Sequence, residues 1–285
     1  MQLENVADIY PLSPVQQGML FHALSAPGSG VYVEQYACKL QGELQVTEFQ
    51  QAWQQVIDRQ PVLRTAFLWE GLDEPLQVVR QQVKAVWQLD DWQNYSPVKQ
   101  EETLTDFLAC DRTQGFDLLQ APISRFRLIR LQADIHQFIW SFHHVLADGW
   151  SIPIIWQEVL TCYRANCRQE SPTLPTLHPY RDYIAWLKHQ NTSSAEGFWR
   201  AQLKGFIDPT PLPAARSELS TQPYRQQTRP LTPQLHTKIQ TLARHHRLTL
   251  NTLLQGAWAL LLNHYSGQRE VTYGSVVSGR PTDLK

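Results

Sequence analysis

The sequence lacks the features that direct a protein to a membrane or to nucleic acid. No apolar run approaches the ~20 residues of a membrane-spanning helix, and the N-terminal residues have neither the basic nor the apolar region of a signal peptide. The 25 basic and 26 acidic residues are scattered, without a basic stripe, and give a net charge of −1. We therefore expect a soluble cytoplasmic protein whose main partner is neither nucleic acid nor membrane.

Cysteine is also scarce. The four cysteines, Cys38, Cys110, Cys162 and Cys167, have neither zinc-binding nor redox spacing. We interpret them as free thiols and expect no bound metal. Apolar residues, in contrast, are plentiful: 42% of the 285 residues are hydrophobic and ten are tryptophan. This is enough for a sizeable core, in one large domain or in two lobes.

The most informative stretch is residues 141–151, which read SFHHVLADGWS. It lies at the end of an apolar and aromatic run, 136–142, that predicts a buried strand. A turn at 133–134 and a strand over 121–131 precede that run, which predicts a hairpin. Residues 152–168 predict a helix. His143 and His144 are therefore expected where a strand gives way to a turn.

This pattern suits a general base and its support. An imidazole with an ordinary pKa near ~6.5 accepts a proton at neutral pH, and the end of a strand fixes its orientation. Asp148 is expected to orient a ring or to hold the loop through an arginine, and Gly149 to need a positive φ or a close approach. Two alternatives remain: a buried histidine pair that only satisfies backbone carbonyls, and a metal site, for which no further ligand has suitable spacing.

The stretch resembles the His-His-x-x-x-Asp-Gly signature, followed by Trp or Val and then Ser, of condensation domains of nonribosomal peptide synthetases. The motif also occurs in chloramphenicol acetyltransferase and related acyltransferases, so alone it indicates a superfamily. Further motifs in the expected order narrow it. Ser13, Gln16 and Met19 match the family's first motif, and Ser13 followed by Pro14 also predicts an ordinary capped helix.

Two later stretches resemble further family motifs. Residues 59–67 match the second, with Gln60 where the family usually has histidine. Arg64 is the candidate for a structural ion pair or hydrogen bond near the site. Residues 180–186 match the fourth, and their aromatic side chains are expected to pack the helix down. Residues 271–281 predict a strand that enters a loop. There Arg280 is the candidate partner of Asp148, a pair whose disruption would cost ~3–5 kcal/mol.

The resemblance implies an α/β fold of the chloramphenicol acetyltransferase type. It has two lobes, each a mixed sheet flanked by helices, and here the second lobe is expected to be incomplete. Residues 1–170 would form the first lobe, and residues 171–285 a linker and the beginning of the second. A tunnel at the junction would admit two phosphopantetheine arms.

The reaction implied by the resemblance is amide-bond formation between a donor aminoacyl or peptidyl thioester and an acceptor aminoacyl thioester. The partners would be upstream and downstream peptidyl carrier proteins, whose phosphopantetheine arms carry the substrates, and an adjacent adenylation domain. No cofactor would be bound directly. His144 would remove a proton from the amine or position it. His143 would support it, Asp148 would be structural, and the Gly149 N–H would face the developing oxyanion.

Three alternatives share this pattern. An epimerisation domain has the same fold and histidine pair, although Trp150-Ser151 and Arg64-Thr65 fit a condensing domain better. A coenzyme A-dependent acyltransferase would use the same histidine with a soluble thioester. A non-catalytic fragment would only dock carriers or a partner chain.

Overall fold

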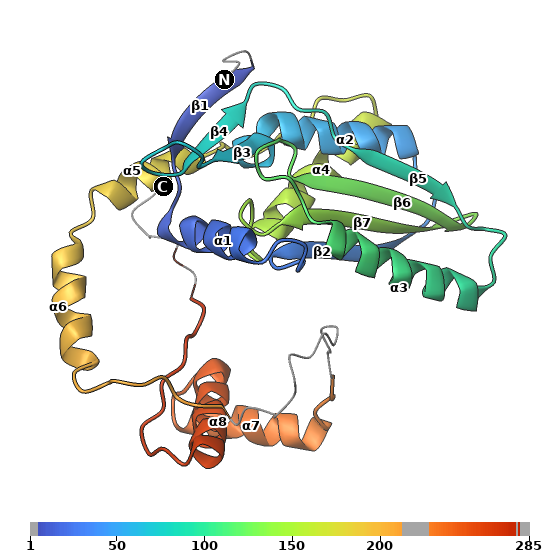
Figure 1. Cartoon of the computed structure of the whole chain (residues 1–285). Coiled ribbons are helices and arrows are strands. Elements are labelled where there is room, and N and C mark those ends of the chain that lie inside the picture. Colours follow the sequence, from blue (N-terminus) through green and yellow to red (C-terminus); the bar gives the residue numbers. More distant parts are fainter. Residues whose placement is uncertain (1–4, 213–227, 278, 280–285) are drawn as a thin grey trace. The chain divides into compact units, whose positions relative to one another are not determined.

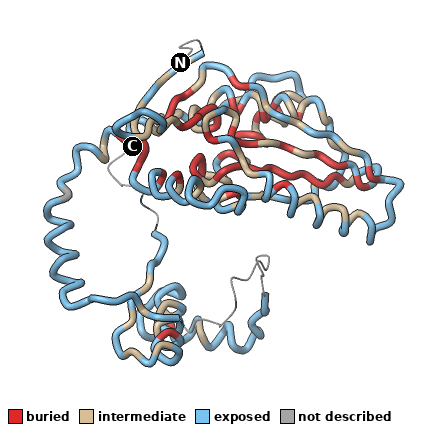
Figure 2. Tube along the Cα trace, in the orientation of Figure 1, coloured by how far each residue is buried: buried red, intermediate tan, exposed pale blue. Residues whose placement is uncertain are grey.

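The computed structural model describes residues 5–212, 228–277 and 279 (Figure 1). The chain divides into two compact units, with the division between Gln190 and Asn191. The first unit holds both sheets, and Figure 2 shows its buried residues concentrated along the central strands and the helix faces next to them. Among the helices of the described ranges, none is long and apolar enough to cross a membrane.

The first unit is built on a four-stranded sheet in the order β2-β7-β6-β5. Its central pair, β6 (Ser124–Gln132) and β7 (Ile135–His143), is antiparallel and confirms the predicted hairpin. β2 (Val33–Gln41) pairs antiparallel with β7, and β5 (Trp87–Asp91) pairs parallel with β6, so the sheet is mixed. Beyond its first residue all of β7 is buried, which requires cover on both faces.

Helices provide that cover. α2 (Val46–Arg59) and α4 (Ser151–Cys167) lie on one face of the sheet and α3 (Pro97–Gln114) on the other (Figure 1). The buried residues of α2 recur at helical spacing, and Trp53 among them packs 5.5 Å from Phe138 and 5.1 Å from Trp140 between ring centroids. The opposite face carries a smaller core formed by α3 and the alternate residues of β6 and β7.

A second, three-stranded sheet has the order β1-β4-β3 and is antiparallel throughout. Its strands are β1 (Val6–Pro11), β3 (Thr65–Leu68) and β4 (Leu76–Arg80). The 3₁₀ helix η1 (Pro61–Arg64) leads into β3, and α1 (Pro14–Ser25) follows β1.

The first unit extends past residue 170, the expected end of the first lobe. It includes α5 (Tyr180–Lys188), which contacts β1 through an ion pair of 3.1 Å between Arg181 and Asp8. Arg59 also donates a hydrogen bond to the carbonyl of Pro175, which ties the connecting segment to α2. Whether these parts are lobes of a larger fold stays a prediction.

The described part of the second unit is helical, with α6 (Thr192–Gln202), α7 (Pro233–His245) and α8 (Leu250–Ser266). The predicted strand at Val271 is wrong for residues 271–277, which have no regular structure. A strand needs a neighbouring strand for its backbone groups. Here Tyr273 Oη donates to the Gln255 carbonyl of α8 at 2.9 Å, and the Thr272 N–H donates to Thr210 Oγ1 at 2.7 Å. The α/β class itself, with two sheets flanked by helices, is confirmed.

Candidate active site

The histidine pair lies where β7 ends, as predicted. The His143 N–H donates to the Ile123 carbonyl at 3.3 Å, and the His144 N–H donates to the Tyr32 carbonyl at 2.8 Å. The backbone of both residues is therefore held by a neighbouring segment, which fixes the direction in which each side chain leaves the chain.

The His143 ring is buried and uncharged at neutral pH. Burial, and secondarily the adjacent His144, lower the pKa of His143 from 6.5 to about 4. The Val145 N–H donates to His143 Nδ1 at 3.2 Å, so the proton of the neutral ring is on Nε2. Among the described residues, buried Nε2 has no hydrogen-bond partner.

His144 differs from His143 in exposure. Its side chain is half-buried, and its Nδ1 atom is buried without a partner in the described part of the chain. Because the three residues that follow the pair are all buried, their packing fixes the path of the backbone after His144. Those residues, Val145, Leu146 and Ala147, belong to the main core cluster. The loop that carries His144 is therefore anchored by packing.

A buried pair of glutamines supports this loop from the first motif. Gln16 Nε2 donates to the Val145 carbonyl at 3.1 Å. Gln77 Nε2 of β4 donates to Gln16 Oε1 at 3.1 Å and to the Pro11 carbonyl at 2.9 Å. Gln16 also caps α1 reciprocally with Ser13. The first motif therefore forms a capped helix, as predicted. Its Gln16 side chain also supports the histidine loop, a contact that the sequence did not predict.

The fourth motif also reaches this region. Burial raises the pKa of Tyr180, with smaller raising effects of Tyr183 and Asp148, and a hydrogen bond with the Ser13 side chain opposes the increase. Tyr180 is therefore near both Ser13 and Asp148. Its neighbour Tyr183 stacks 5.9 Å from Trp186 of the same helix. That the motif's aromatic side chains pack the helix down stays a prediction.

Asp148 lies in the turn that leads into α4. Its Oδ1 accepts hydrogen bonds from Ser151 N at 2.9 Å and from Ser151 Oγ at 2.5 Å, which tie the turn before α4 to the first residue of that helix. This geometry agrees with a structural role. Arg280, its expected partner, lies outside the described residues.

Gly149 differs from expectation. Its φ lies outside the positive range, and a Cβ built on it would have no heavy atom of the described structure within 4 Å. No turn or close approach in the described part of the chain requires glycine there. Gly149 is exposed, so its N–H stays a predicted oxyanion donor on accessibility alone.

Arg64 makes hydrogen bonds to backbone carbonyls. Its guanidinium donates to the carbonyls of Ile57 and Gln81, each at 3.0 Å, and to that of Arg80. It thereby joins the end of α2 to the end of β4, the strand that also carries Gln77. Of the two expected interactions, the hydrogen bond is the one that the structure contains.

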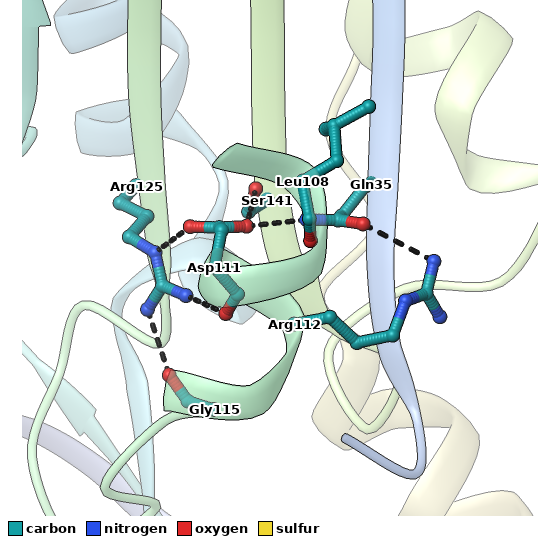
Figure 3. Close-up of polar contacts among 7 residues, drawn as sticks. All are labelled: Gln35, Leu108, Asp111, Arg112, Gly115, Arg125 and Ser141. Carbon is teal, nitrogen blue, oxygen red and sulfur yellow. Dashed lines mark hydrogen bonds and ion pairs between the residues drawn. The ribbon is translucent and has the colours of Figure 1, made fainter. Parts of the chain in front are cut away.

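Sequence reasoning also missed a polar network across β2, β7 and β6 (Figure 3). The buried Asp111 of α3 accepts hydrogen bonds from Arg125 Nε at 2.5 Å, Ser141 Oγ at 2.6 Å and Gln35 Nε2 at 2.6 Å. Gln35 pairs with Ser141 and Ser141 with Arg125 in the sheet register. The only signal in the sequence was polar residues within otherwise apolar strands.

No group of three or more His, Cys, Asp or Glu side chains within the described ranges is arranged to hold a metal ion.

Comparison with known proteins identifies the family. A family model for the condensation domain matches residues 6–285. The chain is 46% identical to one of the linear gramicidin synthase proteins of Brevibacillus parabrevis, over 98% of the chain and 6% of that protein. It is 35% identical to bacitracin synthase 3 of Bacillus licheniformis, over 98% of the chain and 4% of that protein. The chain therefore spans a small part of these relatives.

Solved structures show the same fold. A mutant of the starter condensation domain of rhizomide synthetase RzmA in a "product-released" conformation matches with a TM-score of 0.75 and 21% identity, over 92% of this chain and 60% of that one. The condensation domain of the monacolin K polyketide synthase MokA matches with a TM-score of 0.70 and 18% identity, over 93% and 61%. This confirms the predicted chloramphenicol acetyltransferase-like fold. The chain belongs to the condensation-domain family of nonribosomal peptide synthetases.

Proposed function

We propose that this chain contributes the reacting histidine for amide-bond formation between two thioesters. The donor is an aminoacyl or peptidyl thioester and the acceptor an aminoacyl thioester, each on the phosphopantetheine arm of a peptidyl carrier protein. An adenylation domain adjacent in the synthetase would load such carriers. Membership of the family and the identity to a linear gramicidin synthase protein support this proposal.

The observation that carries the proposal is the contrast between the two imidazoles. A general base works best when its pKa is near the working pH. His143 has its pKa lowered to about 4, is buried and accepts a backbone N–H at Nδ1, so it is a poor base and a good support. His144 is half-buried on the same anchored loop and is left as the group that meets substrate.

The reaction then needs few groups from the protein. The acceptor amine attacks the donor thioester carbonyl; a C–N bond forms and the C–S bond breaks. The amine proton passes to His144 and from it to the leaving thiolate, so the ring returns to its starting state. The exposed Gly149 N–H faces the charge that develops on the carbonyl oxygen. Holding the amine near the carbonyl supplies a further part of the acceleration.

The test uses the chain in the protein in which it occurs, together with separately loaded donor and acceptor carriers. Mass spectrometry of the acceptor carrier should show the dipeptidyl thioester. An acceptor carrier without its phosphopantetheine arm is the matched control and should give none. Product from acyl-coenzyme A with no donor carrier would favour the coenzyme A-dependent alternative. Carrier binding without product, in protein shown to be folded, would favour the non-catalytic one.

A further inference from the structure

Tyr32 packs against both histidines. Its ring lies edge-on to them, with centroids 6.1 Å from His143 and 6.3 Å from His144, the second at an interplanar angle of 89°. Both separations fall in the range of favourable aromatic pairs. The Tyr32 ring centroid is also 6.3 Å from that of His22 on α1. Tyr32 precedes β2 and is far in sequence from the histidine motif.

The backbone of Tyr32 is also engaged. Its carbonyl accepts the hydrogen bond from the His144 N–H at 2.8 Å. Its φ is 60°, in the left-handed region, which a bulky side chain rarely adopts. Such a conformation persists only where the surrounding structure enforces it, and it is often found at functional sites.

Arg112 at the end of α3 enforces the conformation of this loop. A Cβ on Gly30, whose φ is 69°, would lie 2.6 Å from Arg112 Cγ and 2.9 Å from its carbonyl oxygen, so the loop touches α3 directly. Arg112 also donates to the Val33 carbonyl at 3.2 Å. A further hydrogen bond of 3.1 Å runs from Arg112 to Gln35 Oε1 (Figure 3). The residues on both sides of Tyr32 are thereby fixed.

Ordinary core packing does not account for this placement. Tyr32 is half-buried and belongs to neither apolar core cluster of the described chain. Its ring contacts in the described structure are with three histidines and no other aromatic side chain. Tyr32 therefore packs against the imidazole rings and is not part of an apolar core cluster.

We infer that Tyr32 is a positioning residue for the proposed reaction, with Arg112 as its support. The ring confines the His144 imidazole to one orientation, and the Tyr32 carbonyl holds the backbone from which that imidazole projects. Fixed orientation raises the fraction of encounters in which His144 meets the attacking amine. This inference rests on the proposed function, but its structural half can be tested without turnover.

The test compares Tyr32→Leu with Tyr32→Phe. Leucine removes the aromatic ring but keeps a bulky side chain at the positive φ, and phenylalanine keeps the ring. We expect Tyr32→Leu to lower kcat about 10- to 100-fold with KM for the carriers unchanged, and Tyr32→Phe to recover most of the rate. Tyr95→Leu, which removes an exposed tyrosine far from the pair in sequence, is the matched control and should keep the wild-type rate.

A second measurement uses the same chains labelled with ¹⁵N in histidine. The wild type and Tyr32→Phe should each give one sharp set of imidazole signals for His143 and His144, with His143 protonated on Nε2. Tyr32→Leu should broaden or average those of His144 while its melting temperature stays close to that of the Tyr95→Leu variant.

Unchanged imidazole signals in Tyr32→Leu would overturn the inference. So would a large fall in melting temperature that Tyr32→Phe restores without any selective effect on the His144 signals, since Tyr32 would then be a packing residue. Absence of product from the wild type would count against the proposed function alone, because the imidazole signals would still decide the role of Tyr32.

Discussion

Gln16 Nε2 donates a hydrogen bond to the carbonyl oxygen of Val145, 3.1 Å away and 129 residues later in the chain. Val145 directly follows the histidine pair, and its own N–H is bonded to His143 Nδ1. A side chain of the first motif therefore holds the peptide next to the proposed reacting residue. This contact explains how two short motifs that lie far apart in the sequence act on one site.

The Gln16 contact predicts a selective loss of stability. Gln16→Ala leaves the Val145 carbonyl and the Gln77 amide buried without this partner, which should lower the free energy of unfolding by ~1–3 kcal/mol. Gln17→Ala on the exposed face of α1 is the matched control. Urea unfolding measures the stability of both variants. Equal midpoints would contradict a stabilising role of the Gln16–Val145 hydrogen bond.

His143 predicts a dependence of stability on pH. Its pKa is lowered from 6.5 to about 4 in the fold, so between these values the unfolded chain binds a proton that the folded chain does not. The stabilisation is complete above pH 6.5, is lost as the pH falls toward 4, and amounts to about 3 kcal/mol. Burial also lowers the pKa of His136, which adds to the same trend.

Urea unfolding of His143→Gln between pH 4.5 and 7 tests this assignment. The variant should lose stability less steeply than the wild type as the pH falls. His178→Gln, which changes a histidine of the same unit outside its helices and strands, should follow the wild type. Parallel curves for all three proteins would show that His143 is not the titrating group.

Of the substitutions considered, we expect Asp111→Ala to lower stability the most. Asp111→Ala leaves the Arg125 guanidinium without its carboxylate and breaks the link from α3 to β7, so we expect a loss of ~3–5 kcal/mol. Glu102→Ala, on an exposed turn of the same helix, should be nearly neutral. Thermal unfolding distinguishes them. A small effect of Asp111→Ala would mean that the network adds little beyond the packing of α3.

We expect the fold to tolerate alanine at position 149. Gly149→Ala places a Cβ where no atom of the described structure lies within 4 Å, and the φ is one that alanine adopts. The free energy of unfolding should change by less than about 0.5 kcal/mol, and product should still form because alanine keeps the N–H. A stable variant without product would show that a group near Gly149 needs the space.

The sequence predicts the elements with local signals. The apolar run through β7 and its short turn from β6 predict the hairpin and so place the histidines at a strand end, and the periodicity of α2 predicts a buried helix. The predicted strand at Val271 fails because strand structure depends on a partner that local pattern does not supply.

The contacts that complete the site have no local signal. Tyr32 meets His144 because β2 pairs with β7, and Gln16 meets Val145 because α1 packs under the loop, which only the fold specifies. Asp111 looks like any other acidic residue of a charged helix until Ser141 and Arg125 are seen beside it. Motif resemblance points to His144 as the candidate residue, but not to the residues that contact it.

The most direct test of the proposed mechanism replaces His143 and His144 in turn. Mass spectrometry then measures dipeptidyl-carrier formation in the protein in which the chain occurs. His144→Ala should lower the rate of product formation by ~10²–10⁴-fold and leave the melting temperature unchanged. His143→Ala should lower both the melting temperature and the rate of product formation. Near-normal product from folded His144→Ala would contradict the central claim that His144 performs or directs the proton transfer.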